Sequence, residues 1–387
     1  MCVAPGRTRG GGDRSAHRVS RDDPAADFAR CRRQPLEPGT PRQSREPGPG
    51  TRHGAPRGIG NRPVYANGAP TANASFGIRS PHHGVASVIG DYATPQAFRS
   101  ALEARLRLIA QQRGIDLRRL YRWVAFERLL ARLFAPTSPP WVLKGGYALE
   151  VRFDNRARAT LDLDLTLPDP ASWAQEVGAD APASWMAFSY EHLQQAAAHT
   201  LNDGFEFRLA QPKLEQTGAP GGGLRCAVEA RLAGRTFARF HLDLGLGDTI
   251  AAQPEWIQLH SLLEFAGIPA PRIALYPVEQ QFAEKIHAYT FPWRDRENTR
   301  VKDLADLVLL ITSGMLDVLR VRAALHATFE TRGTHALPGE LPAPPSSWAV
   351  VYAALAQEFA LPATTLDAAF VLVCDYWHEH GFGQQQQ

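Results

Sequence analysis

The run RATLDLDLTL, at residues 158–167, alternates apolar and polar side chains with a period of two. This period predicts a β-strand over residues 160–167, because successive side chains of a strand point to opposite faces. One face carries four leucines and is expected to pack against a core: Leu161, Leu163, Leu165 and Leu167. The other face carries Asp162 and Asp164 between two threonines, so two carboxylates lie side by side on one strand.

The two aspartates repel each other unless their charge is compensated. At a separation of about 6 Å the repulsion is about 0.7 kcal/mol in water and about 3 kcal/mol at an effective dielectric of about 20. A divalent cation reverses the sign of this interaction, since Mg²⁺ takes carboxylate oxygens and keeps its other positions for water and phosphate. A solvated outer strand face explains the pair as well, so both interpretations stay open at this point.

A third aspartate occurs in a comparable setting. Residues 224–248 read as two alternating runs joined by a turn at residues 233–235, which predicts a β-hairpin. In the second run Asp243 falls on the face opposite Leu242 and Leu244. Three strand carboxylates are the ligands that a two-metal phosphoryl or nucleotidyl transfer site requires, with Asp243 on the side of the base. The competing interpretation is that Asp243 is a structural residue near the end of a strand.

Lysines and glycines add candidates for phosphate binding. Only four of the 42 basic residues are lysines, namely Lys144, Lys213, Lys285 and Lys302, and a lysine supplies a compact point charge. Lys144 precedes Gly145 and Gly146, and paired glycines before a helix allow close approach of a phosphate. Lys285 borders the apolar stripe of a predicted helix and is placed to reach a triphosphate. An ordinary tight turn and a surface lysine are the alternatives.

Apolar spacing of three and four residues predicts helices on both sides of these strands. Lys302 and Asp306 lie four residues apart in one of them, where they could form an ordinary helix pair. Asn298 or Thr299 is its candidate N-cap and Gly314 its end. The predicted helices cover residues 95–113, 117–134, 277–291, 300–313, 348–360 and 364–379.

Composition sets the domain organisation. The first 90 residues carry fourteen arginines against six acids, are rich in Gly and Pro, and are expected to be a disordered basic leader. The remaining residues carry about −5, because the whole chain carries +3. Scattered cysteines and the lack of a long apolar run favour a cytoplasmic protein without a membrane span. We expect a core with N-terminal helices at 91–250, a helical region at 251–380 and a tail at 381–387.

Five short motifs occur in order between residues 95 and 315: LKGGYALEVR, RATLDLDL, HLDLGLGD, EKIHA and NTRVKDLADL. Together they resemble the nucleotidyltransferase toxins of the AbiEii/AbiGii type, within the polymerase-beta-like nucleotidyltransferase superfamily. The resemblance implies an α+β fold with a mixed sheet, flanking helices and a helical C-terminal half. It also implies Mg²⁺, a nucleoside triphosphate (NTP) as substrate, an RNA acceptor such as tRNA and a separately encoded antitoxin, in a toxin–antitoxin or phage-defence system.

The resemblance assigns roles residue by residue. Asp162 and Asp164 would bind metal, Lys285 would hold the triphosphate, and Asp306 would position either Lys285 or the acceptor. The nucleotide-binding group would contain Lys144, Gly145, Gly146, Arg158, Thr160, Lys302 and Asp306. The family often has a small or hydroxyl residue after the glycines, where this chain has Tyr147, which leaves the choice of nucleotide open.

Two other functions fit parts of the sequence. DLDLT also matches the Asp-x-Asp-x-Thr motif of haloacid-dehalogenase-like phosphatases, with Asp162 as nucleophile. That interpretation finds no second acid four residues after the aspartate of GDTIAA, and it leaves Gly145 and Gly146 unexplained. A non-catalytic nucleic-acid-binding module would use the basic leader, although the mildly acidic remainder argues against a broad phosphate-binding surface.

Overall fold

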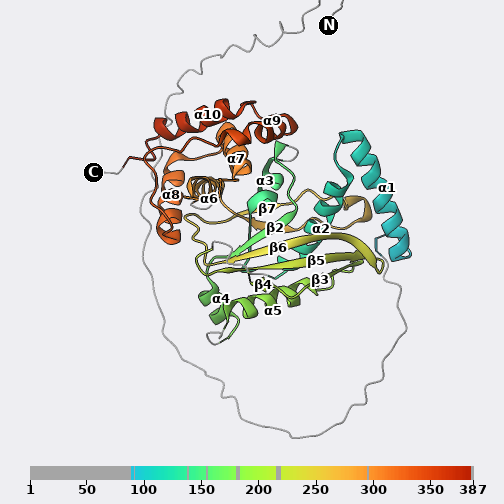
Figure 1. Cartoon of the computed structure of the whole chain (residues 1–387). Helices are drawn as coiled ribbons and strands as arrows, with labels where there is room; N and C mark the ends of the chain where they lie inside the picture. Colours follow the sequence, from blue (N-terminus) through green and yellow to red (C-terminus); the bar gives the residue numbers. More distant parts are fainter. Residues whose placement is uncertain are drawn as a thin grey trace, which may run out of the picture. The chain divides into compact units, whose positions relative to one another are not determined.

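An eight-stranded mixed β-sheet organises the part of the chain that this computed structural model describes, namely residues 89–90, 92–136, 139–153, 156–179, 184–214, 219–293 and 296–384. The chain divides into two units, Met1–Arg79 and Ser80–Gln387, and all described residues belong to the second. The predicted leader therefore lies outside the described residues, except for its last two positions. Figure 1 shows the sheet with helices packed around it.

The strand order in the sheet is β3-β5-β6-β2-β1-β8-β7, with β4 paired to β5. β2 is parallel to β6 and β1 is parallel to β8, whereas the other pairs are antiparallel. The strands are β1 (Val142–Lys144), β2 (Asp162–Leu167), β3 (Phe205–Leu209), β4 (Lys213–Leu214), β5 (Gly223–Leu232), β6 (Arg235–Leu246), β7 (Glu255–Gln258) and β8 (Arg272–Leu275). The two longest strands, β5 and β6, form the hairpin that the sequence predicts.

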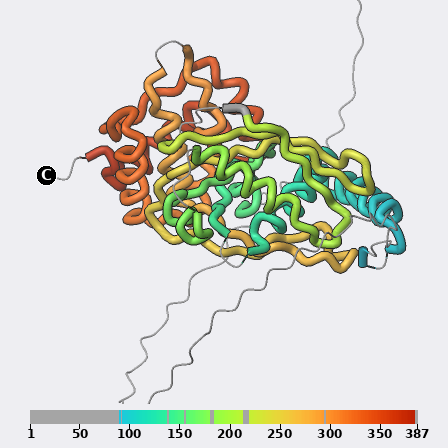
Figure 2. The backbone as a smooth tube through the Cα atoms, turned by 90° about the horizontal axis from the view of Figure 1, so that it is seen from below, coloured from blue at the N-terminus to red at the C-terminus, as the bar shows by residue number. Residues whose placement is uncertain are grey.

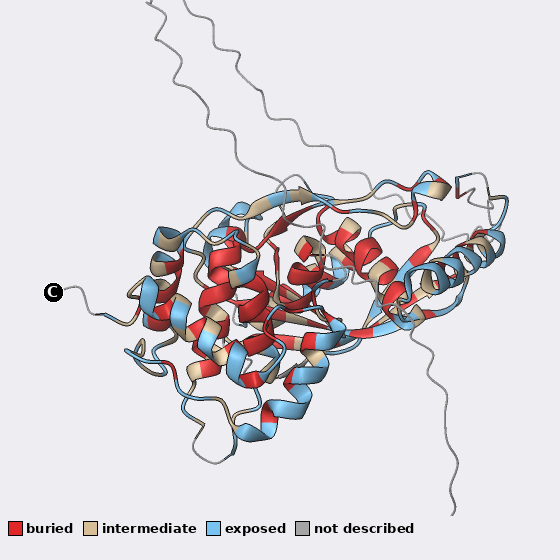
Figure 3. Ribbon diagram, turned by 90° about the horizontal axis from the view of Figure 1, so that it is seen from above, coloured by how far each residue is buried: buried red, intermediate tan, exposed pale blue. Residues whose placement is uncertain are grey.

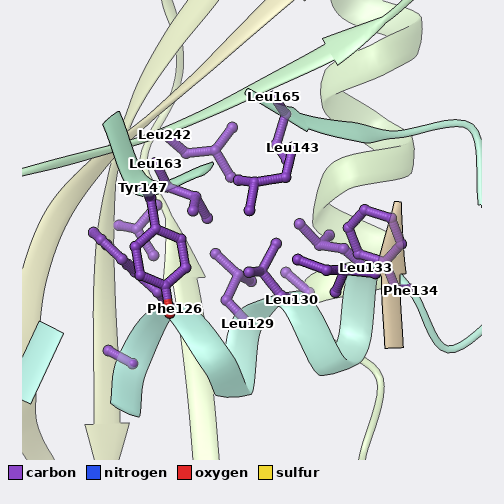
Figure 4. Close-up of a cluster of buried hydrophobic side chains, with 14 of the residues drawn as sticks. Phe126, Leu129, Leu130, Leu133, Phe134, Leu143, Tyr147, Leu163, Leu165 and Leu242 are labelled. Carbon is purple, nitrogen blue, oxygen red and sulfur yellow. The ribbon is translucent and has the colours of Figure 1, made fainter. Parts of the chain in front are cut away.

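The apolar face of the sheet packs against the first helices. α1 (Pro95–Arg113) and α2 (Leu117–Leu133) match the predicted helices at 95–113 and 117–134, and α5 (Trp185–Ala197) and the short α4 (Pro170–Glu176) follow β2. The leucines of β2 and β6 share one core with these helices. Figure 4 shows side chains of α2 facing the strand leucines across this core: Phe126, Leu129, Leu130, Leu143, Leu163, Leu165 and Leu242.

A second core holds the helical half together. Its helices are α3 (Gly145–Phe153), α6 (Val278–Thr290), α7 (Val301–Thr312), α8 (Val318–Arg332), α9 (Ala349–Glu358) and α10 (Leu366–Glu379), with short 3₁₀ turns at Glu264–Ala266 and Ser346–Trp348. Buried apolar residues of these helices form one cluster. In Figures 1 and 2 the orange and red helices gather at one end of the sheet. Figure 3 shows buried residues on the strands and inner helices, and exposed residues on the outer helix faces.

This arrangement confirms the predicted α+β class with a mixed sheet, flanking helices and a helical C-terminal half, and it differs from the sequence prediction in three details. β2 begins at Asp162 instead of residue 160, so Leu161 precedes the strand and is 63% exposed. β7 and β8 extend the sheet past residue 250, so the helical half begins at α6. α7 begins after Arg300 without a side-chain cap, because Asn298 Oδ1 accepts the Arg300 N–H instead.

Within the described residues, no helix has the length and apolar character needed to cross a membrane.

Candidate functional site

A cavity of about 330 Å³ opens on the polar face of the sheet, where α6, α7 and α8 approach it. Strands β1, β2 and β6 supply one wall and the three helices supply the other. Seven of the predicted site residues line it: Lys144, Gly145, Gly146, Arg158, Asp164, Asp243 and, from α6, Lys285. Residues more than 180 positions apart in the sequence therefore meet at one site.

Strand register brings the carboxylates together. Asp164 on β2 lies directly opposite Asp243 on the parallel strand β6, and both line the cavity. Asp162 lies two residues earlier on the same face of β2, at the register position of His241 and outside the cavity lining. Neighbouring strands are about 4.8 Å apart, so the Asp164 and Asp243 side chains start from adjacent positions. The predicted convergence of acidic side chains on one face of the sheet is present.

Arg225, on β5, links two of these carboxylates. Its guanidinium lies 2.8 Å from Asp243 Oδ2 and 3.2 Å from Asp162 Oδ1. The side chain is partly exposed, and the sequence interpretation did not include it. The Arg225 side chain therefore contacts two acids that come from different strands, β2 and β6.

The donor chemistry at this point fits a hard divalent cation. Carboxylate oxygens are the ligands that Mg²⁺ prefers, and the Arg225 guanidinium stands where positive charge is held between two of them. In the described part of the chain, no three or more His, Cys, Asp or Glu side chains are already grouped as a metal site. Burial raises the pKa of Asp164 and Asp162 raises it further, while Lys144 and the Gly146 N–H oppose this rise.

The glycine pair fits tightly against β2. Gly145 has a φ of +68°, and a Cβ there would lie 2.0 Å from Asp164 Oδ2. A Cβ on Gly146 would lie 2.8 Å from Thr160 Oγ1. Both positions therefore require glycine, for conformation or for space. α3 begins at Gly145, so its first backbone amides and the positive end of its dipole lie at the cavity wall, where a phosphate can bind.

Lys285 belongs to a buried ion-pair network on the helical wall. Its Nζ lies 2.6 Å from Asp306 Oδ2 and 3.3 Å from Asp303 Oδ1. Arg158 Nε lies 3.1 Å from the same Asp306 oxygen. Burial lowers the pKa of Lys285, but Asp306 and Asp303 outweigh it and the net shift is upward, so the ammonium stays charged. The alternative of a surface lysine is wrong, since the residue is only 8% exposed.

Lys144 belongs to a second ion-pair network at the cavity. Its Nζ lies 2.5 Å from Asp248 Oδ2 and 3.5 Å from Glu284 Oε1. Arg332 contacts the same two acids, at 3.2 and 3.0 Å. The sequence interpretation did not include Asp248, Glu284 or Arg332, because their contacts depend on how α6 and α8 pack on the sheet. The cavity is thus lined by cationic side chains from two ion-pair networks as well as by its aspartates.

Three residues singled out in the sequence lie elsewhere. Lys302, predicted to bind the nucleotide, is exposed and does not line the cavity. Thr160 is buried behind Gly146 and donates its hydroxyl to the Asp162 carbonyl at 3.2 Å. Tyr147 points into the core, where its ring packs edge-on against Phe126 with centroids 4.8 Å apart (Figure 4). The bulky residue after the glycines therefore leaves the cavity open.

Gln281 is a further cavity residue, and no sequence motif singles it out. It lines the cavity one helical turn before Lys285 and is 3% exposed. Neither its amide nitrogen nor its amide oxygen has a hydrogen-bond partner among the described residues. Buried amide groups are normally hydrogen-bonded, so this side chain has an unused donor and an unused acceptor at the wall of the cavity.

Comparison with known proteins assigns this chain to a family. The family model described as "Nucleotidyl transferase AbiEii toxin, Type IV TA system" matches residues 128–371, which is well over half of the chain. Among solved structures, MenT4, a nucleotidyltransferase toxin from Mycobacterium tuberculosis H37Rv, is similar with a TM-score of 0.49 and 17% identity, over 74% of this chain and 90% of that chain. Comparison with curated protein sequences gives no match. The matched span includes the glycine pair, the three aspartates and Lys285, and the chain therefore belongs to the AbiEii family of nucleotidyl transferase toxins of type IV toxin–antitoxin systems.

Proposed function

We propose that this toxin transfers a nucleoside monophosphate from an NTP to a hydroxyl of an RNA acceptor such as tRNA, with Mg²⁺ as cofactor. The observation that carries the proposal is the pairing of Asp164 with Asp243 in a cavity that Lys144, Arg158 and Lys285 also line. An NTP brings negative phosphates that suit these cationic side chains, and it brings Mg²⁺ that suits the carboxylates.

Each wall has a separate task in this reaction. The start of α3 at Gly145 offers backbone amides and the positive end of the helix dipole to phosphate oxygens. Lys285, held by Asp306, places positive charge beside the phosphates that leave. Asp164 and Asp243 would hold Mg²⁺, which when bound lowers the pKa of an attacking hydroxyl and offsets charge on the leaving group.

The bond changes follow from this arrangement. The acceptor hydroxyl oxygen bonds to the α-phosphorus, and the bond from the α-phosphorus to the oxygen that bridges it to the β-phosphorus breaks. Pyrophosphate leaves with that bridging oxygen, and the hydroxyl proton passes to a carboxylate or to water. The products are an RNA extended by one nucleoside monophosphate and free pyrophosphate, so no oxidant or other co-reactant is needed.

The cellular setting follows from the same chemistry. We propose that the toxin acts in the cytoplasm, where NTPs and tRNA are available, and that a separately encoded antitoxin restrains it. A role in phage defence would use the same addition of nucleotides to RNA. The phosphatase alternative has less support, because Asp162, its nucleophile, lies outside the cavity lining and is held by Arg225. The binding-module alternative relies on a leader that lies outside the described residues.

Labelled triphosphates test the proposal directly. The purified protein is incubated with Mg²⁺, total RNA and each NTP in turn, labelled at the α- or at the γ-phosphorus. We expect α-label in RNA, γ-label in released pyrophosphate, and neither after chelation of the metal. Release of free phosphate from a monoester, without label in RNA, would favour the phosphatase instead.

A further inference from the structure

A second hollow lies on the polar face of the sheet, beside the cavity. It has a volume of about 650 Å³ and is open to solvent along β3, β5 and β6. We call it the basic groove and define it by six of its lining residues: Arg122, Leu161, Arg208, Glu229, Arg239 and His241. It contains none of the cavity residues described above.

Strand β6 runs from the basic groove to the cavity and supplies residues to both. Arg239, His241 and Asp243 occupy alternate positions of this strand, so they share one face and follow one another at intervals of about 7 Å. Asp243 lines the cavity, and Arg239 and His241 line the groove. His241 Nδ1 also lies 3.5 Å from Asp162 Oδ1. A ligand lying along β6 would therefore pass from the groove to the paired carboxylates.

The charge of the groove differs from that of the surrounding chain. Residues 91–387 carry a net charge of about −5, yet the groove has three arginines against one glutamate. The Arg239 side chain is 74% exposed although it contacts Glu229, and the His241 side chain is 50% exposed. Leu161 adds an exposed apolar side chain to the same hollow. Arginines beside apolar surface suit a strand that carries both phosphates and bases.

We propose that the basic groove binds the single-stranded end of the acceptor RNA, with the strand lying along β6 from Arg239 past His241 toward Asp243. This inference rests on the proposed function and adds the path by which the acceptor hydroxyl reaches the cavity. Arg208 and Arg239 contact phosphates of the strand, while the triphosphate occupies the cavity. Because these contacts are to the RNA backbone, they set affinity and register without reading a sequence.

A charge-reversal double variant tests the inference. Arg208→Glu with Arg239→Glu is compared with Arg107→Glu with Arg320→Glu, two exposed arginines of α1 and α8 that lie outside both hollows. The measurements are the affinity for a single-stranded RNA oligonucleotide, the affinity for NTP without RNA, and the KM for RNA in label transfer. Thermal unfolding of each variant establishes that it is folded.

We expect the groove variant to bind the oligonucleotide at least ten-fold more weakly and to raise the KM for RNA by a similar factor. Its NTP affinity stays at the wild-type value, and the control variant matches wild type throughout. The slope of log affinity against log salt becomes shallower by about 1.4, since each lost phosphate contact of a single strand accounts for about 0.7.

The outcomes separate this inference from the proposed function. Unchanged oligonucleotide affinity in the folded groove variant overturns the groove, even if wild type labels RNA. Loss of oligonucleotide binding in the groove variant supports the groove, even if wild type transfers no label, in which case the proposed function fails alone. If the variant keeps its RNA affinity but escapes neutralisation by the antitoxin, the hollow is a protein-binding surface and the inference is wrong.

Discussion

Lys285 Nζ lies 2.6 Å from Asp306 Oδ2; both residues are buried, and Lys285 lines the cavity whereas Asp306 does not. Arg158 contacts the same carboxylate at 3.1 Å. Asp306 therefore contacts two cations at once, and the positions of both side chains at the cavity depend on it.

Replacement of Asp306 by alanine removes the negative charge that both Lys285 and Arg158 contact. We expect Asp306→Ala to lower the free energy of unfolding by about 3–5 kcal/mol, the usual effect of removing one partner of a buried ion pair. Lys302→Ala, on the exposed face of the same helix, should change it by less than about 0.5 kcal/mol. Urea unfolding of both variants measures this difference, and equal midpoints would contradict the role given to Asp306.

Gly145 is required both for its positive φ and because a Cβ would clash with Asp164, and a matched variant can separate these two reasons. Gly114 has nearly the same φ, +65° against +68°, but no atom lies within 4 Å of a Cβ placed there. Gly114→Ala should therefore cost only the conformational strain of about 1–2 kcal/mol. Gly145→Ala should cost more and also abolish NTP binding, because its Cβ displaces Asp164. Calorimetric titration of NTP into each folded variant measures the effect, and normal binding by Gly145→Ala would refute it.

Adjacent glutamines on α6 provide the next prediction. Gln280 accepts the Ala251 N–H and donates to Thr328 Oγ1, whereas the Gln281 amide has no partner among the described residues. Gln280→Leu should destabilise the fold by about 1–3 kcal/mol, because it leaves buried groups unpaired. Gln281→Leu should leave the free energy of unfolding unchanged or higher. If Gln281 contacts the bound nucleotide, as we expect, its variant raises the KM for NTP. An unchanged KM would exclude that contact.

The periodic segments could be predicted from the sequence, since their side chains repeat on one face. α1, α2 and the β5–β6 hairpin were predicted within one or two residues of the observed bounds. β7 and β8 were missed because each has four residues, and their stability comes from pairing with each other and with β1. A pattern of four residues carries too little information to predict a strand.

Arg225 illustrates why part of the site could not be predicted. A regular hairpin with this turn would place Leu224 opposite Asp243, because Leu232 pairs with Arg235 next to the turn. A bulge at Ala230/Arg231 shifts the register by one residue, so Arg225 faces Asp243 instead. The carboxylates themselves could be predicted, since each lies in a strongly alternating run. Their cationic partners depend on a local irregularity and on long-range packing.

His287 should make the protein less stable in acid. Burial, with smaller contributions from Arg332 and His335, lowers the pKa of His287 to about 3. Between pH 6.5 and 3 the unfolded chain binds a proton that the folded protein excludes, so the free energy of unfolding falls as the pH falls. This group contributes a slope of up to about 1.4 kcal/mol per pH unit. Urea unfolding at pH 6.5, 5.5 and 4.5 should give a shallower slope for His287→Gln than for wild type. Identical slopes would contradict the assignment.

Removing the charge of the Asp164 carboxylate tests most directly whether the cavity performs metal-dependent nucleotidyl transfer. Asp164→Asn keeps the size of the side chain and removes the charge that would hold Mg²⁺ opposite Asp243. Asp375→Asn, on the exposed face of α10, is the matched control. Transfer of α-labelled NTP to RNA is measured with wild type and both variants at equal concentration. We expect full transfer by the control and none by folded Asp164→Asn. Full transfer by Asp164→Asn would contradict metal-dependent nucleotidyl transfer in the cavity.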